Sequence, residues 1–156
     1  MTRRRQASAP GTAAVPAPPR LVFDTALLLR ALLLGDAPAR RLRLAWQQGH
    51  CRPLIGGAQA RELLRALAHP GLQLAEAQRE ELLADFLPYA EVVDEGPAPR
   101  GKTRPPALRL ALAKAARADA LVSDSTELRS GFKALLSRSE ASLCRLLDSK
   151  EFLASL

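Results

Sequence analysis

The chain has little of the chemistry that builds zinc sites and disulfide scaffolds. Its 156 residues contain two cysteines, Cys51 and Cys144, and two histidines, His50 and His69. None of them falls in a C-x-x-C pair or another spacing that is typical of zinc ligands, so we expect no zinc site. Two isolated cysteines are instead expected to be buried, reduced thiols, as is usual in an intracellular protein.

Aromatic residues and long apolar runs are also scarce. Aromatics make up 4% of the chain and apolar residues 47%, so leucine, alanine and valine must build most of the core. The leucine-rich stretch at residues 21–34 is interrupted by Asp24 and Arg30, and no apolar run reaches membrane-spanning length. No apolar segment follows the arginines at positions 3–5, which argues against a secretory signal. We therefore expect a cytoplasmic protein with no membrane partner.

Positive charge is what the chain has in excess. With 23 lysines and arginines against 16 aspartates and glutamates, the formal net charge is +7. This balance favours polyanionic partners such as RNA, DNA or an acidic protein surface, although an arginine-rich composition can carry such charge without a function. Residues 1–20 are basic and rich in proline and alanine, which predicts a disordered tail. Residues 21–156 have the length of a single domain.

Hydrophobic periodicity predicts strands that alternate with helices. Strands are expected at 21–24, 52–55, 90–93, 120–123 and 143–147, and helices at 25–34, 38–49, 58–68, 75–87, 107–117, 127–137 and 149–156. A basic, proline-rich loop is expected at 96–106. This alternation favours an α/β fold, a three-layer α/β/α domain with a central parallel sheet. In such sheets, functional residues gather at the carboxyl ends of the strands.

Three carboxylates fall where this architecture would bring them together. Asp24 ends the first predicted strand, Asp124 follows the strand at 120–123, and Glu62 lies in the helix at 58–68. Converging carboxylates repel one another unless a cation lies among them, and oxygen ligands suit Mg²⁺ or Mn²⁺. A metal ion held there could activate water to attack a phosphodiester. Taken singly, an aspartate at a strand end is often a helix cap, and a glutamate on an amphipathic helix is often only solvated.

Four segments carry a family resemblance. They are LVFDTA at residues 21–26, RELLRALAHP at 61–70, LALAKAARADALVS at 110–123 and LCRLLDSKEFL at 143–153. In order and spacing the chain resembles the PIN-domain family of ribonucleases, and most closely the toxin branch of bacterial toxin–antitoxin pairs. The resemblance implies a PIN-like fold and an RNA-cleaving enzyme dependent on Mg²⁺ or Mn²⁺. It makes Asp24 and Glu62 the first two acidic metal ligands. Asp124, a further candidate ligand, and Glu127 could substitute for the family's turn aspartate if the turn shifts, and all four are catalytic candidates. It also implies an antitoxin protein and a second copy of the chain as candidate partners.

The chain departs from the family pattern in three places. The family's asparagine after Asp-Thr is Ala26, and Ser125 stands at the aspartate of its threonine-x-aspartate turn. No acidic residue occurs between Glu95 and Asp119, where a third acidic position is expected. Losing one group that stabilises the transition state can cost on the order of 10²–10³ in rate, and fewer carboxylates also weaken metal binding. We therefore expect nuclease activity to be weak or lost, with no metal cofactor if it is lost.

The basic loop offers a substitute for the metal. If Asp24 and Glu62 are partly buried together they need a positive charge, which Arg104 or Lys102 could supply in the place of the ion. The alternative is that both basic side chains are simply solvated on a flexible loop.

Three functions stay open from the sequence. The first is a metal-dependent ribonuclease toxin, and the second is a catalytically inactive PIN-like module that binds RNA or a protein. The third treats Asp24 as a phosphoacceptor in a receiver-like domain. That function is disfavoured because Leu21, Val22 and Phe23 stand before Asp24, where receiver domains carry an acidic pair.

Overall fold

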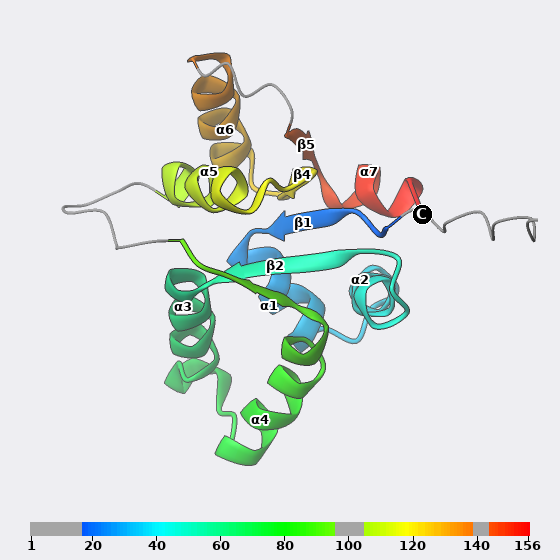
Figure 1. Ribbon diagram of the computed structural model, residues 1–156. Coiled ribbons are helices and arrows are strands. Elements are labelled where there is room, and N and C mark those ends of the chain that lie inside the picture. The colour runs from blue at the N-terminus through cyan, green and yellow to red at the C-terminus, as the bar shows by residue number, and fades with distance from the viewer. Residues whose placement is uncertain (1–16, 96–104, 139–143) are drawn as a thin grey trace, which may run out of the picture.

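The computed structural model describes residues 17–95, 105–138 and 144–156, which form an α/β domain around one parallel sheet (Figure 1). Every neighbouring pair of strands is parallel, and the order across the sheet is β3-β2-β1-β4-β5. The strands are β1 (Arg20–Phe23), β2 (Arg52–Gly56), β3 (Glu91–Val93), β4 (Ala120–Val122) and β5 (Arg145–Leu147). The predicted α/β class with a central parallel sheet is confirmed.

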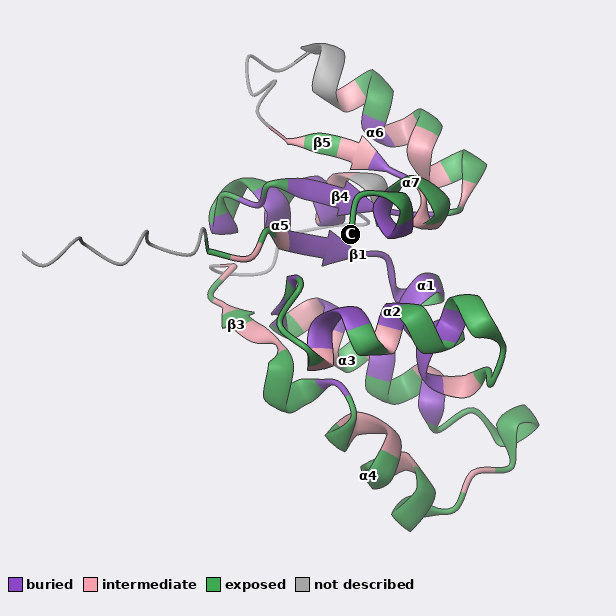
Figure 2. Cartoon of the chain, turned by 90° about the vertical axis from the view of Figure 1, so that its right-hand side faces the viewer, coloured by how far each residue is buried: buried purple, intermediate pink, exposed green. Residues whose placement is uncertain are grey.

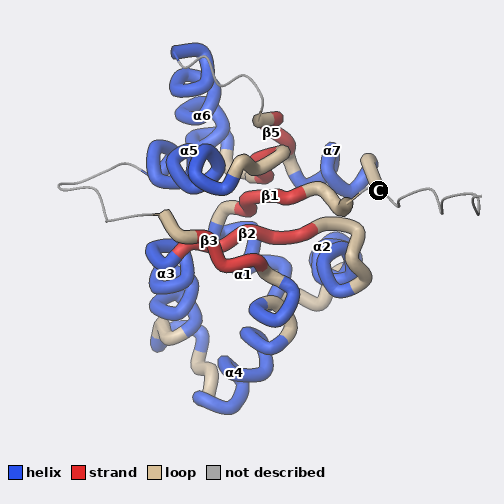
Figure 3. Tube along the Cα trace, in the orientation of Figure 1, coloured by secondary structure: helices blue, strands red, loops and turns tan. Residues whose placement is uncertain are grey.

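Helices cover both faces of the sheet and give the predicted three layers (Figures 1 and 3). The first face is covered by α1 (Thr25–Leu33), α2 (Ala37–Gln47), α3 (Gly57–Leu67) and α4 (Glu76–Ala84), and the second face by α5 (Pro105–Ala116) and α6 (Thr126–Arg138). The last helix, α7 (Ser149–Ala154), packs on the first face through Phe152 and Leu153. Short 3-10 turns lie at Pro70–Leu72 and Leu87–Tyr89.

The central strand β1 alternates its side chains between two apolar cores. Leu21 and Phe23 belong to the core under α1, α2 and α3, whereas Val22 belongs to the core under α5 and α6. All three are buried, as Figure 2 shows for the middle of the sheet. Burial on both faces explains why this segment reads as a continuous apolar run in the sequence.

The few aromatic side chains are concentrated in the first core. Phe23 packs edge-to-face on Trp46 and on Phe152, with ring centroids 6.0 Å and 5.6 Å apart. Trp46 packs in the same way on Phe86, at 5.2 Å, and its Nε1–H donates to the Asp85 carbonyl at 2.8 Å. These aromatic contacts connect β1 with α2 through Trp46 and with α7 through Phe152. Through Trp46 and Phe86 they also reach the segment after α4.

Most element bounds differ from the prediction by one to three residues, and two of these differences have an evident physical cause. Strand β1 begins at Arg20, one residue earlier than expected, and Arg20 donates from Nε and Nη2 to the two carboxylate oxygens of Glu91, at 3.1 Å and 2.6 Å. The helix predicted to end at residue 87 ends at Ala84. Pro88 explains this end, because its ring would clash with the Ala84 carbonyl if the helix continued.

Some expectations fall outside the described residues. These are the predicted tail as far as residue 16 and the basic loop at 96–104, which includes Lys102 and Arg104. Across the parts of the chain that are described, no helix has both the length and the apolarity that a membrane span requires.

Candidate functional site

Asp24 lies at the carboxyl edge of the sheet, directly after β1. Its backbone N–H donates to the Val122 carbonyl of β4 at 3.0 Å, which extends the sheet by one residue. Its side chain caps α1, because the Leu27 N–H donates to Oδ1 at 2.6 Å. The hydroxyl of Ser123, which follows β4, donates to the other oxygen, Oδ2. Asp24 is only 3% exposed, so its carboxyl group exchanges most of its water for these fixed donors.

Burial raises the pKa of Asp24 above its ordinary value of 3.8. The hydrogen bonds from Ser123 and from the Leu27 N–H act in the opposite direction, as does the positive charge of Arg109. Burial is the largest of these effects, and the negative charge of Asp124 adds to it. The ionised form of Asp24 is therefore less favourable in the folded protein than in the unfolded chain.

The variant Asp24→Asn is expected to be at least as stable as the natural chain at neutral pH. Asparagine caps helices as well as aspartate does, and a neutral amide avoids burying a charge. Because the folded-state pKa of Asp24 lies above 3.8, the natural chain loses stability as the pH rises from about 3.8 through that folded pKa. The variant has no such titration, so its advantage in urea unfolding should grow over this window. A deficit at neutral pH that vanishes in acid would contradict the expectation.

Arg109 of α5 bonds to Thr25 at the carboxyl edge of the sheet and to Glu62 of α3. Its Nη2 donates to Thr25 Oγ1 at 2.7 Å and to Glu62 Oε2 at 2.5 Å. Arg109 is 4% exposed, whereas the Glu62 side chain is 43% exposed. One guanidinium thus pairs with Glu62 and with the residue that follows Asp24, and its charge also acts on Asp24. The structure therefore gathers Asp24 and Glu62 around an arginine.

The sequence contains a signal for Arg109 that the pattern of carboxylates did not reveal. Position 109 shares a helical face with Leu112, Ala113 and Ala116, which are all buried. An arginine on the apolar face of a helix needs a buried acceptor, so this position predicts an ion pair. Its Nε is also buried and has no hydrogen-bond partner among the described residues.

Gln59 is a second polar residue of the site that sequence reasoning missed. It lies in the first turn of α3, is fully buried, and donates from Nε2 to the Phe23 carbonyl at 2.6 Å. Its Oε1 has no partner within the described residues. Gln59 therefore fixes α3, which carries Glu62, against the last residue of β1.

The other sequence candidates do not pair with Arg109 among the described residues. Asp124 accepts from the N–H and the hydroxyl of Ser149, each at 2.7 Å, at the start of α7. Glu127 is exposed in the first turn of α6. Ser125 is the turn residue before that helix, where its Oγ accepts from the Leu128 N–H at 3.3 Å. The structure thus directs Asp124 towards α7 and places Glu127 on the surface.

The residues at the carboxyl edge do not fit a divalent metal ion. Mg²⁺ and Mn²⁺ are bound by oxygen ligands, commonly one or two carboxylates together with waters, and these carboxylates must have oxygens free to face the ion. Here one Glu62 oxygen is paired with Arg109, and both Asp24 oxygens accept hydrogen bonds. Within residues 17–95, 105–138 and 144–156, no three histidine, cysteine, aspartate or glutamate side chains converge to hold a metal. The positive charge of the site comes from the protein itself.

The expected cation was Arg104 or Lys102, and both lie outside the described residues. Among the described residues, the cation paired with Glu62 is Arg109. Arg109 lies in α5, the helix that follows residues 96–104, so its backbone has a fixed helical position. A charge on a helix is positioned more firmly than one on a loop, so Arg109 is suited to a permanent pair with Glu62.

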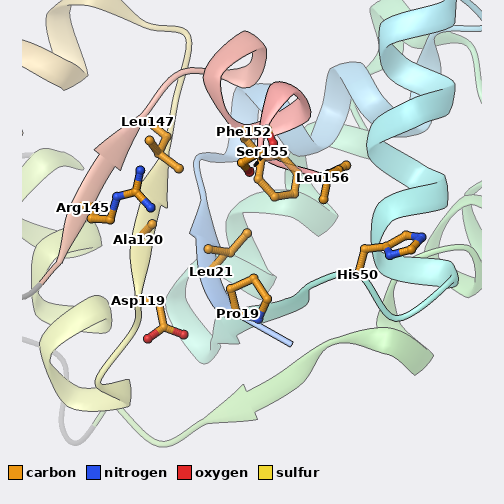
Figure 4. Close-up of a pocket in the computed structure, with 10 residues that line it drawn as sticks. All are labelled: Pro19, Leu21, His50, Asp119, Ala120, Arg145, Leu147, Phe152, Ser155 and Leu156. Carbon is orange, nitrogen blue, oxygen red and sulfur yellow. Dashed lines mark hydrogen bonds between the residues drawn. The ribbon is translucent and has the colours of Figure 1, made fainter. Parts of the chain in front are cut away.

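A cavity of about 340 Å³ lies at the opposite, amino edge of the sheet. Its ionisable lining residues are His50, Asp119 and Arg145. Figure 4 shows these three side chains at separate places around the cavity. Asp119 is engaged by the backbone N–H of Arg20, which donates to Oδ2 at 2.8 Å. The cavity therefore offers no converging set of groups for acid–base or nucleophilic chemistry.

The domain is thus a three-layer α/β protein with a carboxyl-edge site centred on an arginine. No protein-family model matches the sequence, and no curated protein matches it. A solved structure that it resembles is PAE2754 from Pyrobaculum aerophilum, at 18% identity over 92% of each chain, with a TM-score of 0.49. A likeness this distant identifies neither a family nor an activity.

Proposed function

We propose that the chain is a PIN-like domain that binds RNA without cleaving it by a metal-dependent mechanism. The ion pair between Arg109 and Glu62, beside the buried Asp24, carries this proposal. The resemblance of four sequence segments to PIN domains supports the family, and the three-layer architecture is compatible with it.

The physical reason is competition between two cations for one place. A dication about 5 Å from a guanidinium would be repelled by roughly 7 kcal/mol at an effective dielectric constant of about 20. Removing the guanidinium from Glu62 would instead leave a buried charge without its partner, which is also unfavourable. A metal ion must overcome one of these costs at carboxylates that already have partners, since Glu62 pairs with Arg109 and Asp24 accepts two hydrogen bonds.

RNA is the favoured ligand because the chain carries a formal net charge of +7. Binding to phosphates by lysine and arginine releases counterions, so the affinity should fall steeply as the salt concentration rises. This binding does not require the carboxylates at the carboxyl edge.

The test is to incubate the full chain with single-stranded RNA in Mn²⁺, in Mg²⁺ and in chelator. We expect the same intact RNA under all three conditions, for the natural chain and for Asp24→Asn alike. Fluorescence anisotropy on the same RNA should show salt-sensitive binding. Manganese-dependent cleavage that disappears in Asp24→Asn would overturn the proposal, and so would half-saturation by Mn²⁺ in the micromolar range.

A further inference from the structure

A second cavity, of about 500 Å³, lies where α1, α2, α6 and α7 meet. We call it the basic cavity, because Arg30, Arg41, Arg129 and Lys150 line it together with the carboxylates of Asp124 and Asp148. We propose that the basic cavity binds phosphate groups of an RNA backbone. The choice of RNA rests on the proposed function, whereas the affinity for phosphate rests on the cavity itself.

The four cationic side chains come from four different helices. Arg30 lies on α1, Arg41 on α2, Arg129 on α6 and Lys150 on α7. Charges of one sign repel, so bringing four of them to one cavity is unfavourable unless anions share the space. Two carboxylates line the cavity, which leaves a net of two positive charges.

The carboxylates of Asp124 and Asp148 both accept hydrogen bonds from residues at the start of α7. Asp124 accepts two hydrogen bonds from Ser149, and Asp148 Oδ1 accepts from the Glu151 N–H at 2.7 Å. The hydrogen bond from that N–H is the main cause that lowers the pKa of Asp148, so Asp148 stays ionised near neutral pH. These carboxylates shape the cavity without neutralising it.

The cations keep much of their capacity for a ligand. Arg30 is 3.9 Å from Asp124, and Arg129 is 3.8 Å from Asp148 and 3.4 Å from Glu151. Ion pairs of such partly exposed groups are weak. Arg41 donates only to the Leu153 carbonyl, at 3.3 Å, and neither Arg41 nor Lys150 has an ion pair among the described residues. A phosphate oxygen is a stronger acceptor for both groups than water or a distant carboxylate.

The walls define the class of ligand. Pro38 and Leu153 are the apolar lining residues, and no lining residue is aromatic, so the lining offers more to phosphate groups than to bases. A volume of about 500 Å³ lies within the usual range for small-ligand sites and suits a nucleotide unit. Contacts to phosphate position a nucleic acid without reading its bases, so binding here should not depend on sequence.

Charge reversal at single positions tests the location. Arg41→Glu and Lys150→Glu alter the cavity, whereas Arg40→Glu and Lys133→Glu make the same charge change at exposed positions of α2 and α6 that do not line it. At about 0.1 M salt, loss of one phosphate contact should weaken binding about tenfold and flatten the salt slope by about one. The expected result is this loss in both cavity variants, for oligo(A) and oligo(U) alike, and less than about a threefold change in both controls.

Inorganic phosphate gives an independent measurement on the same cavity. In the natural chain, phosphate should shift the backbone amide NMR signals of Ser149 and Lys150, and Arg41→Glu should abolish the shifts. Thermal unfolding checks that each variant is folded. If Arg41→Glu is not folded, the phosphate titration is made on Lys150→Glu, which should abolish the shifts in the same way.

The outcomes separate this inference from the proposed function. Equal losses of RNA affinity in all four variants would overturn the basic cavity as the site and leave RNA binding standing. If the natural chain bound no RNA, the proposed function would fail, and phosphate shifts at Ser149 and Lys150 would still support a phosphate site. Absence of those shifts would overturn that site.

Discussion

Arg109→Ala is expected to lower the free energy of unfolding by about 2–4 kcal/mol. Breaking a buried ion pair typically costs about 3–5 kcal/mol, because the remaining charge loses its partner. Glu62 is 43% exposed and can regain some water, which places the expected loss towards the lower end. The variant also leaves the Thr25 hydroxyl without its donor and empties the space that a 4%-exposed side chain filled.

Urea unfolding of two further variants separates the contribution of the Arg109–Glu62 ion pair from that of the packing of the Arg109 side chain. Lys114→Ala changes an exposed charge on the same helix and should cost less than about 0.5 kcal/mol. A double-mutant cycle between Arg109→Ala and Glu62→Gln should give a coupling energy of about 1–3 kcal/mol. A coupling energy near zero would show that Arg109 stabilises the fold by packing alone and that its pairing with Glu62 is incidental.

Phe23→Ala should have the largest effect on stability, about 3–5 kcal/mol. Phe23 is fully buried and packs edge-to-face on both Trp46 and Phe152, so its removal opens a cavity under β1 and interrupts the aromatic contacts of the first core. Its neighbour Trp46 is held by Phe86 and by the hydrogen bond to the Asp85 carbonyl, so Trp46 is not free to move into that space.

The matched variant is Phe23→Leu, which keeps most of the apolar volume and should cost less than about 1.5 kcal/mol. Chemical unfolding gives both values, and near-ultraviolet circular dichroism should show Trp46 losing its fixed environment in the alanine variant only. A loss below about 1 kcal/mol for Phe23→Ala would mean that the first core closes around the gap.

Much of the fold was predictable because its signals are local. The run Leu21-Val22-Phe23 is apolar throughout because both faces of β1 are covered, and that run indicated a buried parallel strand. Asp24 could be placed at the carboxyl edge because it directly follows Phe23, the last residue of β1, and caps α1. Helix α4 ends three residues before the predicted bound, because Pro88 disfavours helix in the turn that precedes it.

The candidate site was only partly predictable. The pattern of carboxylates suggested that Asp24 and Glu62 would share a cation, and the structure gathers them around Arg109. The sequence suggested Arg104 or Lys102 as that cation, and both lie outside the described residues. It did not single out Arg109, whose burial depends on the rotation of α5 against the sheet.

By itself the sequence determined the order of strands and helices, the excess of positive charge and the acidic residue after the first strand. Each of these follows from neighbours a few positions apart or from composition. Only the tertiary structure decided that Arg109 meets Glu62 and that four helices bring their cations to one cavity. Those contacts join residues far apart in the chain, and they exist because the two helical layers pack against opposite faces of one parallel sheet.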